Sequence, residues 1–344
     1  MSESSSKSPA AGDASIYAGV DVGGTNIKVG LITPAGETLA FESFPTEQEA
    51  GAESAMSRSA ETIKQLASEA HVEASAIIGV GLVTPGPLDL ARGVLLDPGN
   101  LPAWHGAPVR DLLASATNLP VTYANDANAA AYGEFLCGAG AKYDSLVMIT
   151  LGTGVGGGII LSDRLVEGAH GAGGEIGHII IDADDEAPLN SLDIRGTLEG
   201  YCGSYGVVGR AEAALADHFV ESSLRDCIVE NEHLTPLLIA NAAEAGDEVA
   251  TKVVLDTAKY LAIGIITCVH MLDPEAIVIG GALTFGGAGH PLGERFLAEV
   301  RTQARQRMIK SLREKVAIDF AQLGGNAGYI GAAGLAMRTG DGLR

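Results

Sequence analysis

The stretch VDVGGTNIKVGLI, residues 20–32, decides the fold of this chain, because it places a bare Gly-Gly-Thr turn between two apolar, strand-like runs. The stretch ITLGTGVGGGIIL, residues 149–161, repeats the same order. Glycine lets backbone N–H groups come close to a phosphate, and threonine adds a hydroxyl donor. The pair of hairpins therefore predicts two related α/β lobes whose turns hold a polyphosphate across a cleft.

Other phosphate-binding motifs do not fit these hairpins. Neither is a P-loop, since GxxxxGKS/T is absent, and neither opens a helix as GxGxxG does, since a strand follows each turn. Two ordinary glycine-rich hairpins are the alternative interpretation. A further pair, Gly280 and Gly281, follows the apolar run AIVI and favours the nucleotide interpretation.

The apolar periodicity along the chain indicates an α/β class, in which strand-rich blocks alternate with helices. Asn125 or Asp126 is expected at the N-cap of a helix that ends near Gly138. Strands are expected within residues 16–33, 37–44, 76–89, 119–126, 145–161, 276–283 and 315–323, and helices at 52–70, 108–116, 125–138, 198–217, 246–271 and 328–338.

Composition limits the classes of function. With 344 residues and 47% apolar residues, the chain is long and hydrophobic enough for two folded domains. Its formal net charge of −21 disfavours nucleic-acid binding through a broad basic face. ATP still fits, because local backbone N–H groups and a metal ion would hold it.

The cysteines and the N-terminus indicate a cytoplasmic protein. Four cysteines form no CxxC pair, which predicts reduced thiols. Residues 1–15 have no apolar segment typical of a signal peptide, and we expect a short disordered tail before a strand at Ile16. No apolar run stands out as a membrane span.

An ordered set of segments resembles the ROK family of sugar kinases and related repressors. The resemblance implies a two-lobed actin-like ATPase (ribonuclease H-like) fold with the active-site cleft between the lobes. The small N-terminal lobe would comprise residues 16–124 plus about 325–344, and the large C-terminal lobe residues 125–324. The segments are DVGGTNIKVG, GLVTPGPLD, NLPAW, NDANAAAYGE, LGTGVGGGII, GEIGHI, IGGAL and GNAGYIGAA.

The resemblance also implies residue roles, with ATP and Mg²⁺ as cofactors. Asp126 would be the catalytic base, and Asp21 would lie near the Mg²⁺ and its waters. The first phosphate loop would run from Asp21 to Thr25, the second would comprise Gly152, Thr153 and Gly154, and Gly280 and Gly281 would pack against adenosine. The ATP-binding residues would be Asp21, Gly23, Gly24, Thr25, Gly152, Thr153, Gly154, Gly280 and Gly281, and the sugar-binding residues Asn100, Asn125, Asp126, Glu175, His178 and Glu199.

The chemistry of these residue types agrees with such roles. Phosphoryl transfer needs a carboxylate that accepts the proton of the attacking hydroxyl, and Asp126 sits where a strand meets a helix. Its alternative role is a helix N-cap, and Glu175 and His178 could belong to a structural turn. Lys28 is interpreted as a solvated or packed strand residue without chemistry.

One segment departs from the family pattern. Many ROK proteins bind a structural zinc through one His and a CxCGxxGC segment, but Asn190, Leu192 and Thr197 occupy the cysteine positions here. We therefore expect no structural zinc. Glu199, which the RGxLE frame still identifies, must be held in another way, and packing of Leu192 and Leu198 is one possibility.

The leading functional hypothesis is an ATP-dependent hexose kinase of carbohydrate metabolism, a transferase that phosphorylates glucose at its 6-hydroxyl. N-acetylglucosamine, N-acetylmannosamine, fructose or allose are alternative substrates, and polyphosphate an alternative donor. A transcriptional repressor is disfavoured, because only about 15 residues precede the first phosphate loop, too few for a helix-turn-helix. A non-catalytic sugar sensor remains an alternative. The resemblance further implies a homo-oligomer, either a dimer or a tetramer.

Overall fold

The computed structural model describes residues 15–231 and 233–340, and divides the chain into two units. Unit 1 contains the chain up to Ala141 and the segment from Gly325 onward, and unit 2 runs from Lys142 to Gly324. The tail expected at residues 1–15 lies outside the described residues, apart from Ser15.

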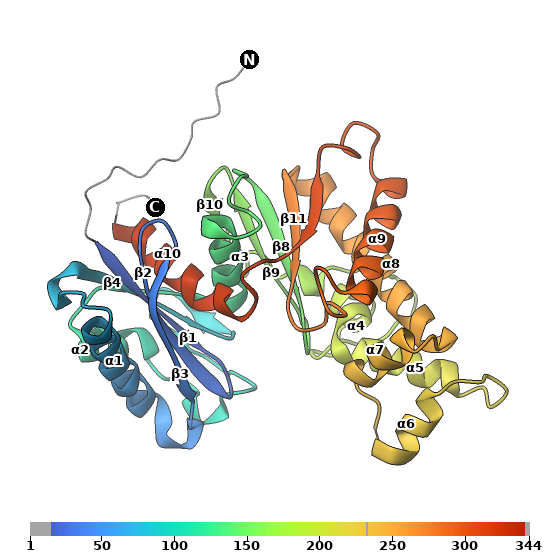
Figure 1. The fold of residues 1–344 in the computed structure, drawn as a ribbon, viewed down its shortest axis with the longest axis horizontal. Helices are drawn as coiled ribbons and strands as arrows, with labels where there is room; N and C mark the ends of the chain where they lie inside the picture. The colour runs from blue at the N-terminus through green and yellow to red at the C-terminus, as the bar shows by residue number, and fades with distance from the viewer. Residues whose placement is uncertain (1–14, 232, 341–344) are drawn as a thin grey trace. The chain divides into compact units, whose positions relative to one another are not determined.

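Unit 1 is built on a five-stranded mixed sheet of order β3-β2-β1-β4-β7 (Figure 1). The β1–β2 and β2–β3 pairs are antiparallel, whereas β1–β4 and β4–β7 are parallel. The strands are β1 (Ile16–Val22), β2 (Asn26–Ile32), β3 (Thr38–Pro45), β4 (Ile77–Thr84) and β7 (Val121–Asn125), with a separate short pair of β5 (Leu88–Asp89) and β6 (Val94–Leu95).

Alternation along β1 assigns its side chains to two layers, since successive residues of a strand point to opposite faces. Val20 and its even-numbered neighbours are buried in one core with residues of α1 (Gly51–Glu69) and α2 (Val109–Thr117). The odd-numbered Gly19 and Asp21 meet α10 (Ala327–Gly340). A Cβ on Gly19 would lie 1.8 Å from the Tyr329 carbonyl oxygen, so only glycine allows α10 to pack this closely.

Unit 2 repeats the topology of unit 1. Its sheet has the order β10-β9-β8-β11-β12, in which the β8–β9 and β9–β10 pairs are antiparallel and the other two pairs are parallel. The two similar hairpins in the sequence predicted this relation between the lobes. The strands are β8 (Leu146–Leu151), β9 (Val155–Leu161), β10 (Arg164–Leu165), β11 (Ala276–Gly280) and β12 (Ala317–Phe320).

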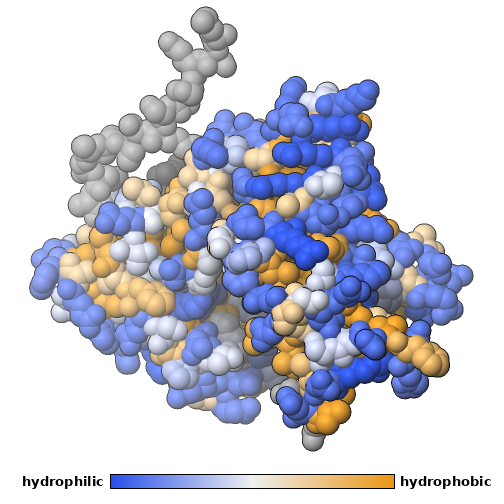
Figure 2. Space-filling model, turned by 45° about the vertical axis from the view of Figure 1, so that its right-hand side comes forward, coloured by the Kyte–Doolittle hydropathy of each residue, from blue (hydrophilic) through white to orange (hydrophobic). Residues whose placement is uncertain are grey.

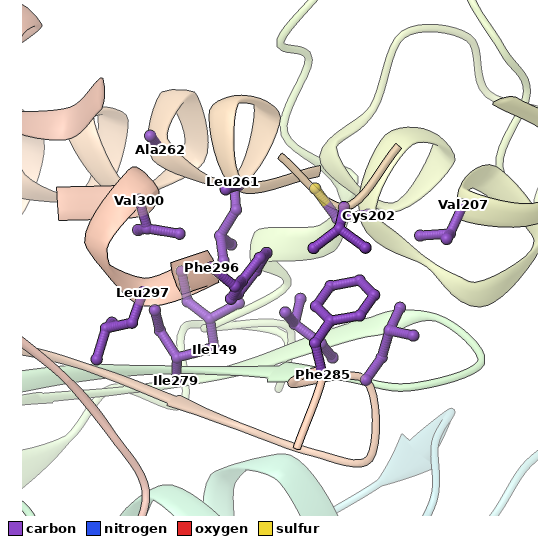
Figure 3. Packing of buried hydrophobic residues seen from close by; sticks show 14 of the residues in the cluster. Ile149, Cys202, Val207, Leu261, Ala262, Ile279, Phe285, Phe296, Leu297 and Val300 are labelled. Carbon is purple, nitrogen blue, oxygen red and sulfur yellow. The ribbon is translucent and has the colours of Figure 1, made fainter. Parts of the chain in front are cut away.

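Helices and strands of unit 2 share one hydrophobic core (Figure 3). Phe296 is fully buried and lies at 4.9 Å, ring centroid to ring centroid, from Phe285. Buried side chains of this size each stabilise a fold by about 1.5–3 kcal/mol. The helices are α4 (Leu198–Cys202), α5 (Ser204–Leu215), α6 (Leu224–Asn231), α7 (Pro236–Glu244), α8 (Glu248–Leu272) and α9 (Pro291–Arg307).

Three of these helices, α6, α7 and α9, were not among the helices expected from the sequence. The single helix expected at residues 198–217 is also interrupted, because Gly203 has an extended backbone and separates α4 from α5. Short 3-10 helices complete the chain: η1 (Gln48–Ala50), η2 (Ala74–Ala76), η3 (Pro102–Trp104), η4 (Ile176–His178) and η5 (Gly324–Asn326).

The boundary between the units differs from the lobe boundary expected at residues 124/125. Helix α3 (Asp126–Cys137) belongs to unit 1, because it packs tightly against α10. A Cβ on Gly331 of α10 would lie 1.7 Å from the Ala129 carbonyl oxygen, so the two helices are in direct backbone contact. The first boundary therefore falls after Ala141, and the second falls before Gly325.

Helix α8 passes the length and composition test for a membrane span, the one helix among the described residues that does so. More than half of its most apolar window is buried, and its Leu261 and Ala262 are fully buried members of the core that Figure 3 shows in part. This is the behaviour of a core helix. On the face drawn in Figure 2, hydrophilic and hydrophobic residues are interspersed.

Candidate active site

The first glycine turn, which the sequence predicts to bind phosphate, lies between β1 and β2 of unit 1 and is held by a buried threonine. The Gly23 N–H donates to the Asn26 carbonyl at 2.9 Å. Thr46 Oγ1 donates to the Gly23 carbonyl at 2.7 Å, and the Thr46 N–H donates to the Thr25 carbonyl at 2.9 Å. A Cβ on Gly24 would lie 3.2 Å from the Asn100 carbonyl oxygen, so the fold brings Asn100 beside this turn.

Asp21 is the penultimate residue of β1, just before this turn. Its Oδ2 would be 2.3 Å from a Cβ on Gly328, in the first turn of α10, where helix N–H groups favour a negative charge. Lys28 faces it across the β1–β2 pair. Burial raises the pKa of Asp21, and the charge of Lys28 opposes that rise.

Lys28 therefore has an electrostatic role that the sequence interpretation did not give it. Its Nζ donates to the Gly325 carbonyl at 2.5 Å, at the start of the chain segment that leads into α10. The lysine thus links the β1–β2 hairpin to the segment before α10 and places a positive charge near Asp21. The interpretation of Lys28 as a residue without chemistry is incomplete.

Asn125 and Asp126 occupy the junction of β7 and α3, at the carboxyl end of a parallel strand. Asn125 Oδ1 accepts from the N–H groups of Ala127 at 2.9 Å and Asn128 at 3.3 Å, which makes Asn125 the N-cap of α3. Asp126 Oδ1 accepts from the Ala127 N–H at 2.8 Å. Asp126 lies in the first helical turn and is not required as the cap.

The environment of Asp126 includes a buried tyrosine on β7. Burial raises the pKa of Tyr123 to about 12, against the effect of its hydrogen bond with Thr84, and the charge of Asp126 adds to the rise. The Tyr123 and Thr84 hydroxyls are 2.8 Å apart. Tyr123 is thus neutral at physiological pH, and its side chain belongs to the buried core of unit 1.

The second glycine turn, which the sequence also predicts to bind phosphate, lies between β8 and β9 of unit 2. The Gly152 N–H donates to the Gly154 carbonyl at 3.0 Å, and the Ser204 N–H at the start of α5 donates to the Gly152 carbonyl at 3.0 Å. Gly281, after β11, has a φ of +91°, and a Cβ there would lie 2.1 Å from the Leu151 carbonyl oxygen. The fold thus brings the Gly280-Gly281 pair against the strand that leads into this turn.

Glu199, on α4, holds the second turn in place. Its Oε2 accepts from the Val155 N–H at 3.1 Å, and a Cβ on Gly154 would lie 2.3 Å from the same oxygen. Its Oε1 accepts from the Ser191 hydroxyl at 2.6 Å and from the Tyr205 hydroxyl at 2.8 Å. Glu199 therefore connects the second glycine turn to the loop before α4 and to α5.

The electrostatics of Glu199 follow from these donors. Burial raises the pKa of a carboxyl group, but the hydrogen bonds from Ser191, Tyr205 and the Val155 N–H outweigh burial, and the pKa of Glu199 is lowered. The carboxylate is thus charged, and both of its oxygens accept hydrogen bonds from the protein. This structural role stands beside the sugar-binding role that the family resemblance implies, which stays a prediction.

Leu192 does not hold Glu199. It is 62% exposed, so the possibility that its packing positions the carboxylate is wrong. Leu198 is fully buried and lies against Gly264 of α8, which agrees with the expectation that Leu198 packing helps to hold Glu199. Ser191 and Tyr205 were missed by the sequence analysis, because no motif marks a hydroxyl that reaches a carboxylate from a separate segment.

Glu175 and His178 form a polar cluster around η4 with a residue that replaces an expected zinc ligand. His178 Nε2 lies 3.7 Å from Glu175 Oε2, and His178 Nδ1 lies 2.9 Å from Asn190 Nδ2. Thr197, in another expected cysteine position, caps α4 by accepting from the Gly200 N–H at 3.1 Å. No group of three or more His, Cys, Asp or Glu residues suited to a metal occurs among the described residues.

The repeated sheet order and the helices packed on each sheet define the actin-like ATPase fold. Within that class, the chain belongs to the ROK family, whose sequence profile matches residues 17–339. It is 34% identical to a glucokinase of Halalkalibacterium halodurans, over 93% of this chain and 94% of that protein.

Two solved structures are similar over nearly the whole chain. The ROK hexokinase from Thermus thermophilus has a TM-score of 0.81 and 30% identity, and the match covers 95% of this chain and 99% of that one. A ROK family glucokinase from Streptomyces griseus, in complex with glucose and AMPPNP, has a TM-score of 0.72 and 30% identity, with 94% and 99% covered.

Proposed function

We propose that this chain is an ATP-dependent hexose kinase that transfers the γ-phosphoryl group of ATP to the 6-hydroxyl of glucose. The observation that carries the proposal is the β7–α3 junction, where Asn125 takes the cap position and Asp126 follows in the first helical turn. Ligands collect at the carboxyl ends of strands in such sheets. The glucokinase and hexokinase relatives support the substrate class.

In this proposal, Asp126 accepts the proton of the 6-hydroxyl as that oxygen attacks the γ-phosphorus. A positioned base of this kind contributes about 10²–10⁴-fold to the rate. Asn125, with its Oδ1 engaged at the helix cap, offers its Nδ2 donor to a sugar oxygen. Asn100, next to the first turn, lies at the edge of the sugar site. In unit 2, Glu175 and His178 bind further sugar hydroxyls.

The phosphate groups of ATP are assigned to the two glycine turns. Backbone N–H groups of Gly24 and Thr25 in unit 1 and of Thr153 and Gly154 in unit 2 are the donors, while the Gly23 and Gly152 N–H groups shape the turns through their bonds to Asn26 and Gly154. Gly280 and Gly281 pack against the adenosine. Small side chains at these positions allow close approach. The AMPPNP complex of the Streptomyces griseus relative supports the use of ATP.

Mg²⁺ is proposed to accompany ATP near Asp21. The residues fit, since Mg²⁺ keeps several waters and takes one or two carboxylates together with phosphate oxygens, and Asp21 offers a carboxylate at the end of β1 next to the phosphate turn. When bound, Mg²⁺ neutralises charge on the phosphates. Lys28 and the first turn of α10 orient the Asp21 carboxylate.

The protein is further proposed to act in the cytoplasm as a homo-oligomer, either a dimer or a tetramer, without nucleic-acid or membrane partners. The net charge of −21 and four free cysteines support this setting. Light scattering coupled to size exclusion measures the oligomeric state. A monomer at micromolar concentration would contradict that part of the proposal.

The decisive experiment is a coupled ADP-release assay with Mg-ATP and a panel of hexoses and N-acetylhexosamines, run on the wild type and on Asp126→Asn. We expect strong turnover on glucose and a loss of kcat of about 10²–10⁴-fold in the variant, with sugar binding retained. Unchanged turnover in Asp126→Asn would refute the base assignment. Sugar binding without turnover in the wild type would identify a sensor.

A further inference from the structure

The two ring nitrogens of His178 have different neighbours. Nδ1 lies 2.9 Å from the side-chain nitrogen Nδ2 of Asn190, and Nε2 lies 3.7 Å from Glu175 Oε2. In a neutral imidazole, one nitrogen carries the proton and donates, while the other accepts. The neighbours therefore decide which nitrogen is the donor.

The orientation of the Asn190 amide is determined by two backbone groups. Asn190 Oδ1 accepts from the N–H of Leu192 at 2.9 Å and from the N–H of Ile194 at 2.9 Å. A backbone N–H can only donate, so the amide oxygen must face these groups and the amide NH₂ must face His178. Asn190 is only 5% exposed, which shields this arrangement from water.

We propose that Asn190 is a positioning residue that keeps His178 in the tautomer with its proton on Nε2. The Asn190 NH₂ group can only donate, so Nδ1 must accept and Nε2 must carry the proton. This inference rests on the proposed function in one respect, namely that the Nε2 side of His178 meets the sugar.

The resulting pair of groups matches one sugar hydroxyl. His178 Nε2–H is a donor, Glu175 is a carboxylate acceptor, and a hydroxyl can accept from the first while it donates to the second. A ligand that lacks this hydroxyl leaves both groups without their partner. The site would thus select a hexose that carries a hydroxyl at this position over the corresponding deoxy sugar.

The test is ¹⁵N NMR of imidazole nitrogens in histidine-labelled protein at about pH 8. The His178 signals are identified by their loss in His178→Gln. We expect a protonated Nε2 and an unprotonated Nδ1 in the wild type. A proton on Nδ1 in the wild type would overturn the proposal, whatever any variant does.

Asn190→Asp supplies a second readout, because its carboxylate can still accept from the Leu192 and Ile194 N–H groups but presents an acceptor to His178. We expect the proton to appear on Nδ1 and the KM for the sugar to rise by about tenfold, with the KM for ATP unchanged. Asn118→Asp, an exposed position at the end of α2, is the matched control and should change neither.

The outcomes separate this inference from the proposed function. A wild type that shows the Nε2–H tautomer but phosphorylates no sugar counts against the kinase and supports the positioning role. An active kinase whose Asn190→Asp variant keeps the Nε2–H tautomer and an unchanged sugar KM counts against the positioning role alone.

Discussion

The two glycine turns have the same strand context but obtain their carboxylates differently. In unit 1, Asp21 is part of β1 itself and faces Lys28 across the hairpin. In unit 2, the matching position of β8 is Thr150, which faces Gly156. The carboxylate next to that turn is Glu199, which reaches it from α4 and accepts from the Val155 N–H.

One sheet topology can therefore hold a glycine turn in two different ways. The turn in unit 1 is held by Thr46, which bonds to Gly23 and Thr25. The turn in unit 2 shares Glu199 with Ser191 and Tyr205. We therefore expect substitutions around the turn of unit 2 to change the KM values for nucleotide and for sugar together.

Gly154→Ala should have the largest effect of the substitutions that distinguish the two turns. Its Cβ would lie 2.3 Å from Glu199 Oε2, whereas a Cβ on Gly152 meets nothing within 4 Å. Overpacking of this kind costs about 1–3 kcal/mol, and the carboxylate must leave the Val155 N–H. We expect a lower Tm in Gly154→Ala by thermal unfolding, and little change in the matched Gly152→Ala. Equal Tm values would show that Glu199 does not occupy this position.

Glu199→Gln and Asp21→Asn should change different sets of KM values, which distinguishes the two turns. Glu199→Gln weakens bonds on both sides of the carboxylate, so the KM values for sugar and for ATP should each rise by about tenfold. Asp21→Asn should raise the KM for Mg-ATP and leave the sugar KM unchanged. Steady-state kinetics with each substrate varied in turn measures the four values. A rise confined to sugar in Glu199→Gln would mean that Glu199 is only a sugar ligand.

The pH dependence of stability should have opposite signs at the two carboxylates. The lowered pKa of Glu199 contributes stability above its ordinary value of 4.5, and this stability is lost as the pH falls through the folded-state pKa. The raised pKa of Asp21 costs stability as the pH rises from its ordinary value of 3.8 through the folded-state pKa.

The pKa shifts of Glu199 and Asp21 give the smallest of the expected effects, a change in Tm of a few degrees between about pH 3 and pH 8. Asp21→Asn should raise Tm at neutral pH, and Glu199→Gln should lower it there and make the loss in acid shallower. Lys28 remains intact in both variants. Shifts of the same sign in the two variants would contradict the assigned environments.

Local signals accounted for much of the fold. The alternation in β1 and the apolar runs of β8 and β11 are visible without any tertiary information, because strand periodicity is a property of the chain. Helix α9 begins with Pro291 and carries Leu292, Phe296 and Val300 at helical spacing, so a signal for it existed and was missed. The break at Gly203 had no such signal, since it depends on packing against the Glu199 and Thr153 carbonyls.

The sequence by itself determined the two hairpins, their related lobes and the candidates Asp126, Glu175, His178 and Glu199, because glycine turns and motif spacing are local and ordered along the chain. Only the tertiary structure decided what surrounds these residues. Ser191 and Tyr205 around Glu199, and Asn190 against His178, come from separate segments, and hydrogen bonds between such segments exist only when folding brings donor and acceptor within about 3 Å of each other.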